Sequence, residues 1–133
     1  MPRTLHVYLE PARVPSLADL QATIRSLRFA LTLDPGYLPQ QTQGYLPCTL
    51  EGEDAGVDLR FDTPPDRPAS AEARATRITL RWGGDPREEL TARILAAAFA
   101  QDFDGRVLDP DHDTVQTAEA LLKQARRLQA DHF

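Results

Sequence analysis

The sequence predicts a single α+β domain in which helices cover one face of a mostly antiparallel sheet. Two observations support this prediction. Short segments with alternating apolar residues, which are typical of half-buried strands, recur along the chain. Segments with apolar residues at helical spacing follow capping residues at about three places. A length of 133 residues suits one core. We therefore expect residues 1–133 to form one domain with the element order β-α-β-β-β-β-α-β-α.

The most regular stretch runs from Arg77 to Leu108. It begins with an alternating strand that ends at Trp82, and a Gly-Gly turn follows. Asp85 before a proline is a strong helix-start pattern, and the long helix behind it carries an apolar stripe. Gly105 closes this unit, and Thr117 caps a final helix after an Asp-Pro turn. The residues expected in the core are Ile78, Leu80, Leu90, Ile94, Phe99, Leu121 and Leu122.

The N-terminal third has the pattern strand, helix, strand. Residues 4–10 alternate between apolar and polar side chains, and a proline follows them. Ser16 is a helix cap, and apolar residues at helical spacing continue to about Arg28. A second alternating strand covers 29–33 and stops at a turn of Asp34, Pro35 and Gly36.

The middle of the chain is expected to form a hairpin between two less regular segments. Residues 37–44 show no period and predict an ordered loop. Residues 45–50 and 57–61 predict paired antiparallel strands around a turn at 51–56, which is rich in acidic residues and glycine. Residues 63–75 are rich in proline and alanine, so we expect an exposed connection there.

Charge and cysteine content limit the classes of partner and compartment. The net charge is −5, whereas nucleic acids and anionic membranes require a basic face. If the charge serves binding, the expected partner is a basic protein; the alternative is that the acidic charge only keeps the chain soluble. Cys48 is the single cysteine, so no disulfide forms within the chain. The N-terminal residues lack an apolar signal core, and no run has the length of a transmembrane helix. These features favour the cytoplasm.

One histidine has acidic neighbours. His112 lies within a turn that also contains Asp109, Asp111 and Asp113. Carboxylates beside a histidine are possible ligands of a divalent ion. The turn lacks the glycine and the later glutamate of an EF-hand loop. A plain turn stabilised by aspartate side chains is the alternative that we favour, so we expect no metal site.

Two further features resemble reactive motifs only in part. Cys48 lies in an apolar strand, which is typical of an inert buried thiol, whereas a nucleophile needs a histidine beside it. Gly83-Gly84 before a helix is found in phosphate-binding loops. Here no lysine follows, and Asp85 places a carboxylate where an anion would bind. We therefore expect neither a catalytic residue nor a cofactor.

The strongest candidate for a binding site is a group of acidic residues around the predicted hairpin turn. Folding of such a turn requires glycine, asparagine or one aspartate, not four acids. The alternative is that the acids are only solvated. Aromatic side chains near loops are candidate anchors for the same partner, although Trp82 also suits the core. The candidate partner-binding residues are Glu51, Glu53, Asp54, Asp58, Tyr37 and Trp82, and Tyr45 is a further aromatic.

Part of the chain resembles short bacterial proteins, some of which are immunity proteins of polymorphic or contact-dependent toxin systems. The similarity begins with the run GYLPCTLEGEDAGVD at Gly44 to Asp58 and extends to Arg126. It includes the segments ITLRW, ILAAAFA, GRVLDP and TAEALLKQAR. These motifs are structural, and the resemblance implies neutralisation of a toxin without implying any catalytic residue.

We therefore expect a non-enzymatic, cytoplasmic protein-binding module. Its expected role is that of an immunity-type inhibitor that covers the active site of a basic toxin domain with an acidic surface. One alternative is a small metal-dependent enzyme that uses His112 and nearby carboxylates. Another is an adaptor protein that self-associates through a sheet edge or a helix face.

Overall fold

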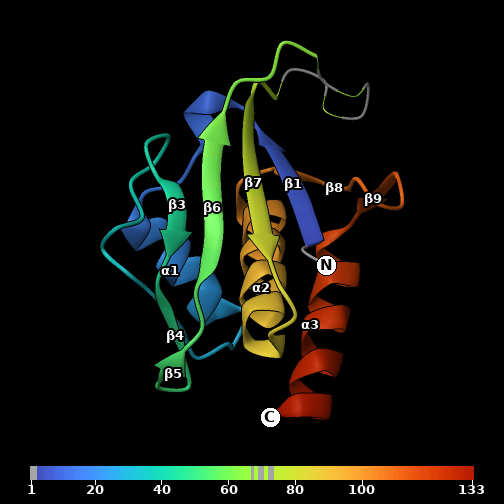
Figure 1. The fold of residues 1–133 in the computed structure, drawn as a ribbon. Coiled ribbons are helices and arrows are strands. Elements are labelled where there is room, and N and C mark those ends of the chain that lie inside the picture. Colours follow the sequence, from blue (N-terminus) through green and yellow to red (C-terminus); the bar gives the residue numbers. More distant parts are fainter. Residues whose placement is uncertain (1–2, 67, 69–70, 72–73) are drawn as a thin grey trace.

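The computed structural model describes residues 3–66, 68, 71 and 74–133. In this part of the chain, three α-helices pack against a six-stranded sheet, and a smaller three-stranded sheet adjoins it (Figure 1). Every strand pairing is antiparallel. The prediction of an α+β fold with a mostly antiparallel sheet is therefore confirmed.

The six-stranded sheet has the strand order β3-β6-β7-β1-β8-β9, and the small sheet has the order β2-β4-β5. The strands are β1 (Arg3–Leu9), β2 (Leu31–Leu33), β3 (Gln43–Leu46), β4 (Cys48–Leu50), β5 (Glu53–Asp54), β6 (Val57–Asp62), β7 (Thr76–Trp82), β8 (Arg106–Asp109) and β9 (Thr114–Gln116). The helices are η1 (Pro11–Arg13, a 3-10 turn), α1 (Leu17–Ser26), α2 (Pro86–Asp102) and α3 (Ala118–His132).

Each α-helix begins after a residue whose side chain accepts a hydrogen bond from a backbone N–H of the first turn. The donor–acceptor distances are 3.1 Å at Ser16, 2.9 Å at Asp85 and 3.0 Å at Thr117. These caps were predicted, because short polar side chains satisfy N–H groups that a first turn leaves free. The helix α1 ends at Ser26, before the expected Arg28, whose φ of 67° is left-handed.

The core lies around α2, in which every residue from Leu90 to Phe99 is buried. The helix contacts the sheet on one side and α1 and α3 on others, so it needs apolar or small side chains all round. Of the predicted core residues, Ile78, Leu80, Leu90, Ile94, Phe99 and Leu121 are fully buried. Leu122 is only partly buried, because α3 buries a narrow stripe centred on Leu121 and Ala125.

The expected strand at 45–50 is two strands in different sheets, because Pro47 interrupts it. Proline has no N–H to donate to a ladder. Before it, β3 pairs with β6 as the predicted hairpin requires, with Leu46 opposite Val57. After it, β4 pairs with β2 and β5 in the small sheet. Neither this small sheet nor β9 was predicted from the sequence.

The connection at 63–75 is less exposed than expected. Residues 67, 69–70 and 72–73 of it lie outside the described residues. Three of the others are buried: Pro64, Ala71 and Arg74. The prediction of an exposed segment is wrong at these three. Arg74 donates from Nε to the Asp104 carbonyl at 2.8 Å and from Nη2 to the Asp104 carboxylate at 2.9 Å. These bonds attach the connection to the C-terminal end of α2.

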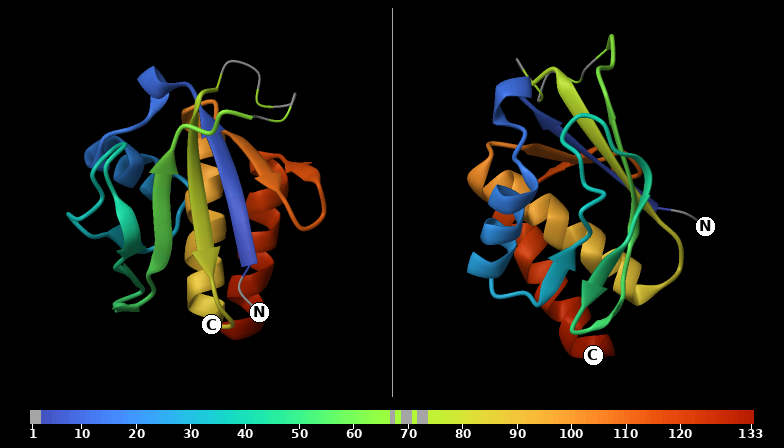
Figure 2. Two further views of the ribbon diagram at one scale, coloured as in Figure 1. Left: turned by 45° about the horizontal axis from the view of Figure 1, so that its top comes forward. Right: turned by 90° about the vertical axis from the view of Figure 1, so that its left-hand side faces the viewer.

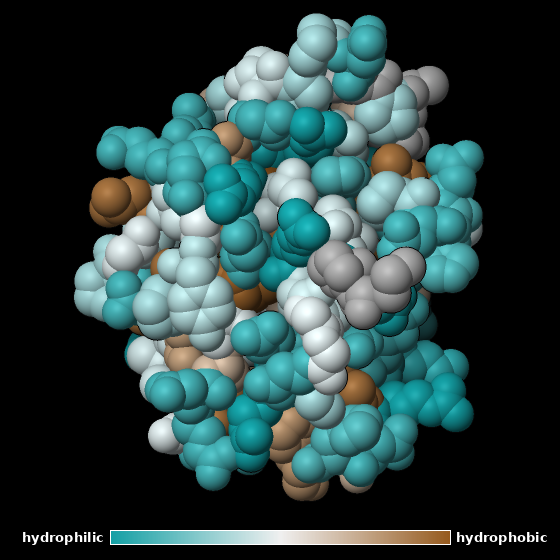
Figure 3. Space-filling view, in the orientation of Figure 1, coloured by the Kyte–Doolittle hydropathy of each residue, from teal (hydrophilic) through white to brown (hydrophobic). Residues whose placement is uncertain are grey.

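The three α-helices cover one face of the six-stranded sheet and leave the other open. Figure 2 shows the helices together on one side of the strands. The opposite face, here called the open face, is turned toward the viewer in Figure 1, and Figure 3 shows that hydrophilic residues predominate on it. Among the described residues, no helix has the length and apolar character to cross a membrane.

Candidate functional site

Three of the predicted carboxylates lie on the hairpin of β4 and β5. Leu50 is opposite Glu53 in the ladder, so the loop between them has two residues, Glu51 and Gly52. Their φ angles are 52° and 83°, which is the left-handed backbone of a type I′ turn. Asparagine or glycine usually occupies such positions. The Glu51 N–H donates to the Ala30 carbonyl at 2.9 Å, so the main chain fixes the turn.

The side chains of Glu51, Glu53 and Asp54 are exposed, and we call this group the acidic hairpin. Glu53 forms an ion pair with Arg87 in the first turn of α2. The carboxylates of Glu51 and Asp54 have no hydrogen bond or ion pair with the described residues. The acidic hairpin therefore presents two uncompensated negative charges to solvent.

A hollow of about 250 Å³ lies beside the first residues of β6 and the last residues of β7. It is lined by Tyr45, Asp58, Arg81, Trp82, Gly83 and Glu88. The structure thus brings the predicted Asp58 and Trp82 together. Asp58 is half-buried and pairs with Arg60 at 2.9 Å, and it lies opposite Arg81 in the ladder. Both signs of charge line the hollow, so it suits a polar partner surface rather than an apolar ligand.

Tyr45 is the exposed aromatic of this hollow. Its side chain is 59% exposed, and its ring lies against Gly56, where an added Cβ would collide with both the ring and the Leu46 carbonyl. Glycine at this position therefore lets Tyr45 lie flat at the margin of the sheet. The other two aromatic residues that were predicted as anchors, Tyr37 and Trp82, are buried.

Tyr37 is in the core and offers no side chain to a partner. It is 1% exposed, its hydroxyl donates to the Pro15 carbonyl at 2.9 Å, and its ring packs 6.2 Å from that of Phe61. Burial raises the pKa of its hydroxyl well above the ordinary value. The prediction of Tyr37 as a partner-binding residue is corrected for this reason.

Trp82 is also buried, with 3% of its surface exposed. Two guanidinium groups lie near its ring, with Arg3 at 5.7 Å and Arg93 at 5.8 Å from the ring centroid. Its indole N–H has no hydrogen-bond partner among the described residues. Trp82 therefore lines the hollow as a buried residue and is not an exposed anchor. This agrees with the alternative that placed it in the core.

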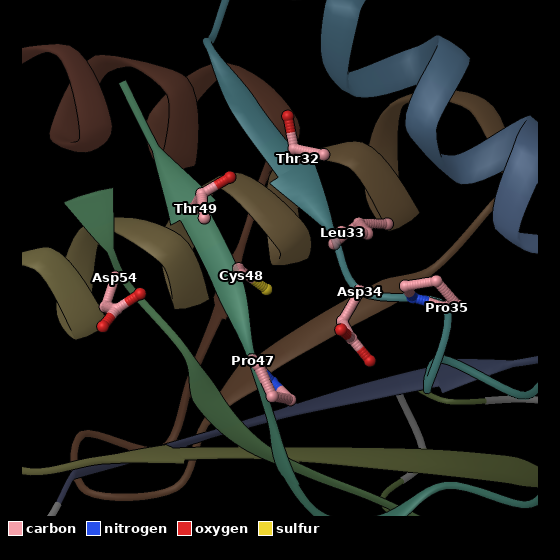
Figure 4. Close-up of a pocket in the computed structure, with 8 residues that line it drawn as sticks. All are labelled: Thr32, Leu33, Asp34, Pro35, Pro47, Cys48, Thr49 and Asp54. Atoms are coloured by element: carbon pink, nitrogen blue, oxygen red, sulfur yellow. The ribbon is translucent and has the colours of Figure 1, made fainter. Parts of the chain in front are cut away.

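Cys48 belongs to a second cavity, of about 270 Å³, between β2 and β4 (Figure 4). Its lining is Thr32, Leu33, Asp34, Pro35, Pro47, Cys48, Thr49 and Asp54. The thiol is nearly buried, and burial raises its pKa to about 12. The cavity lining contains no histidine to act as a base, so the arrangement leaves this thiol protonated at neutral pH.

His112 pairs with a single carboxylate. Its Nδ1 lies 2.9 Å from Oδ2 of Asp109, and the other Asp109 oxygen accepts from the Asp111 N–H at 3.0 Å. Burial alone would raise the pKa of Asp109, but these hydrogen bonds outweigh it and hold the pKa below its ordinary value. Within the described residues, no three side chains of His, Cys, Asp or Glu are grouped so that they could hold a metal ion.

The Gly83-Gly84 turn joins β7 to α2, and a side chain already occupies the helix start. The Asp85 carboxylate accepts from the Arg87 N–H at 2.9 Å. The Gly83 N–H is directed toward the Glu88 carboxylate. Two carboxylates therefore lie where a phosphate would have to bind, which disfavours anion binding at this helix start.

Comparisons with known proteins add no family or relative to this description. No family model matches the chain, and no curated protein or solved structure is significantly similar to it.

Proposed function

We propose that this chain is a non-enzymatic protein-binding module that docks the acidic hairpin onto a basic protein surface. The partner that we propose is a bacterial toxin domain whose active site the hairpin covers. The resemblance of residues Gly44 to Arg126 to immunity proteins supports this choice of partner. The single, buried cysteine supports action in the cytoplasm, where thiols stay reduced.

The observation that carries the proposal is the residue at position 51. A non-glycine residue in the left-handed region lowers the stability of the fold by on the order of 1 kcal/mol. The loss is smaller for asparagine than for glutamate. Glu51 takes this position without any compensating contact from its carboxylate among the described residues. Glutamate is therefore not the residue that folding alone favours here, and we attribute its presence to binding of a cationic surface.

The electrostatics of the acidic hairpin suit rapid encounter with a basic partner. Glu51 and Asp54 are uncompensated, and like charges so close together repel each other modestly through water. An opposed basic surface relieves this repulsion and steers association. The neighbouring hollow, with Tyr45 exposed at its margin, adds contact area for the same partner.

Immunity proteins are encoded beside their toxins, so the proposed partner is the product of the gene next to that of this chain. The experiment is a stopped-flow measurement of association with this product. We expect the double variant Glu51→Lys/Glu53→Lys to keep its fold, because both side chains are exposed, and to associate at least about tenfold more slowly at low salt. The difference should shrink as salt rises.

The matched control reverses two exposed acids elsewhere, Glu10→Lys with Asp111→Lys, and reaches the same net charge. It should associate much faster than the hairpin variant. Equal rates for the two variants would mean that net charge alone matters, and the proposal for the hairpin would be rejected.

A further inference from the structure

The open face of the six-stranded sheet carries a second charged surface. Successive side chains of a strand point to opposite faces of the sheet. Every second residue of these strands faces the helices, and the residues between them belong to the open face. The registers place Arg81 beside Asp58 and Thr4, and Thr79 beside Arg60 and His6. A third row holds Asp62, Arg77, Tyr8 and Arg106.

The face is basic although the chain is acidic. Its four arginines outnumber its two aspartates, which gives a local charge of +2 in a chain of net charge −5. The aspartates are engaged, because Asp58 pairs with Arg60 at 2.9 Å and Asp62 pairs with Arg77 at 2.6 Å. The excess charge therefore belongs to the other two arginines.

Arg81 and Arg106 form no ion pair with the described residues. They lie on β7 and β8, on either side of β1, opposite Thr4 and Tyr8 respectively. Their backbones are roughly 17 Å apart, because they are offset by four residues along β1 and by two strand spacings across the sheet. Each guanidinium has five N–H donors that match carboxylates in a planar fork.

The floor between these arginines includes one row that crosses the sheet and contains Thr79, His6 and Leu108. His6 Nδ1 and Thr79 Oγ1 are 3.2 Å apart, so the two side chains satisfy each other. Burial, and then the nearby Arg77, lower the pKa of His6, which leaves the imidazole neutral at pH 7. Tyr8 is 3% exposed and lies within the surface rather than above it.

We propose that the open face is a second binding surface, and that it takes an extended acidic segment of a protein. Charge complementarity supports this occupant: Arg81 and Arg106, whose backbones are roughly 17 Å apart, match carboxylates about four to six residues apart on one face of an extended chain. This surface is of opposite sign to the acidic hairpin, although it meets the neighbouring hollow at Asp58 and Arg81, so the inference goes beyond the function proposed above.

A protein segment fits this face better than a nucleic acid does. Single-stranded nucleic acids bind to sheets whose exposed aromatic rings stack on the bases. On this face the Tyr8 ring is buried, and the exposed Tyr45 ring lies on the edge strand β3, so among the described residues no row of exposed aromatic rings crosses the sheet. Asp58 and Asp62 would also repel a continuous phosphate backbone, whereas a segment with a few spaced carboxylates avoids them.

The test measures fluorescence anisotropy of a short labelled peptide of alternating Glu and Thr at low salt, with the unaltered chain and with Arg81→Gln/Arg106→Gln. The unaltered chain should bind the peptide, and the double variant should bind it roughly tenfold more weakly. The control Arg25→Gln/Arg127→Gln has the same net charge but changes exposed arginines on the helix side, so it should bind like the unaltered chain.

Three outcomes would overturn the proposal. These are no binding of the peptide by the unaltered chain, equal loss in both double variants, and tighter binding of an oligo(dT) of similar length than of the peptide. The variant Arg81→Lys/Arg106→Lys guards against a folding defect, because it keeps the charge and should restore most of the binding.

Discussion

At the scale of single residues, burial decides which chemical groups are available. Cys48 is an example, because burial moves the pKa of its thiol from 9.0 to about 12. At pH 8 the folded chain should therefore hold about a thousandth of the thiolate of an exposed cysteine. We expect Ellman's reagent to modify Cys48 about a thousandfold more slowly in the folded chain than in urea. Rates within tenfold of each other would contradict this burial.

The burial of a residue could be predicted from the sequence where apolar residues recur at strand or helix spacing. It could not be predicted where no such repeat is present. The alternation that ends at Trp82 correctly offered the core as one alternative for that residue. Tyr37 lies in a segment without a period, and its hydroxyl bonds to Pro15, far away in the sequence. The residues next to Tyr37 in the sequence give no information about such a contact, so the burial of Tyr37 was not predicted. The exposure of Glu51, Glu53 and Asp54 followed from their place in a turn.

At the scale of elements, the ends of strands and helices depend on contacts between distant segments. The break at Pro47 was visible as a residue, but the sheet that β4 joins was not. The partner strand β2 is chosen by tertiary pairing, with Leu33 opposite Cys48. The helices were predicted more accurately, because their caps and apolar stripes are local signals.

The attachment of the 63–75 connection to α2 provides a prediction at this scale. Arg74 is buried and donates to both the carbonyl and the carboxylate of Asp104, whose φ of 56° ends the helix. Arg74→Ala should lower the free energy of unfolding by about 2–3 kcal/mol, because it leaves these acceptors without their charged donor. Urea denaturation measures the loss.

The control is Arg60→Ala, which removes a surface pair with Asp58. The Arg60 side chain is 56% exposed, so its loss should cost less than about 1 kcal/mol. If Arg74→Ala costs no more than Arg60→Ala, the connection is not held to α2 through Arg74.

At the scale of the whole molecule, the fold separates charges of opposite sign. The small sheet places the acidic hairpin beyond the end of the six-stranded sheet (Figure 1). The strand registers bring arginines from β6, β7 and β8 together on the open face. The sequence showed the acids because they are neighbours in the chain. The cluster of arginines could not be predicted, because these residues are distant in the sequence and become neighbours only through the strand register.

The central proposal is that Glu51 of the acidic hairpin lowers the stability of the fold and contributes its negative charge to binding. The direct measurement compares Glu51→Asn with the unaltered chain, both in urea denaturation and in association with the product of the neighbouring gene. Asparagine suits the left-handed turn, so we predict a variant that is about 1 kcal/mol more stable and associates more slowly at low salt. A variant that is no more stable, or that associates as fast as the unaltered chain, would contradict the claim.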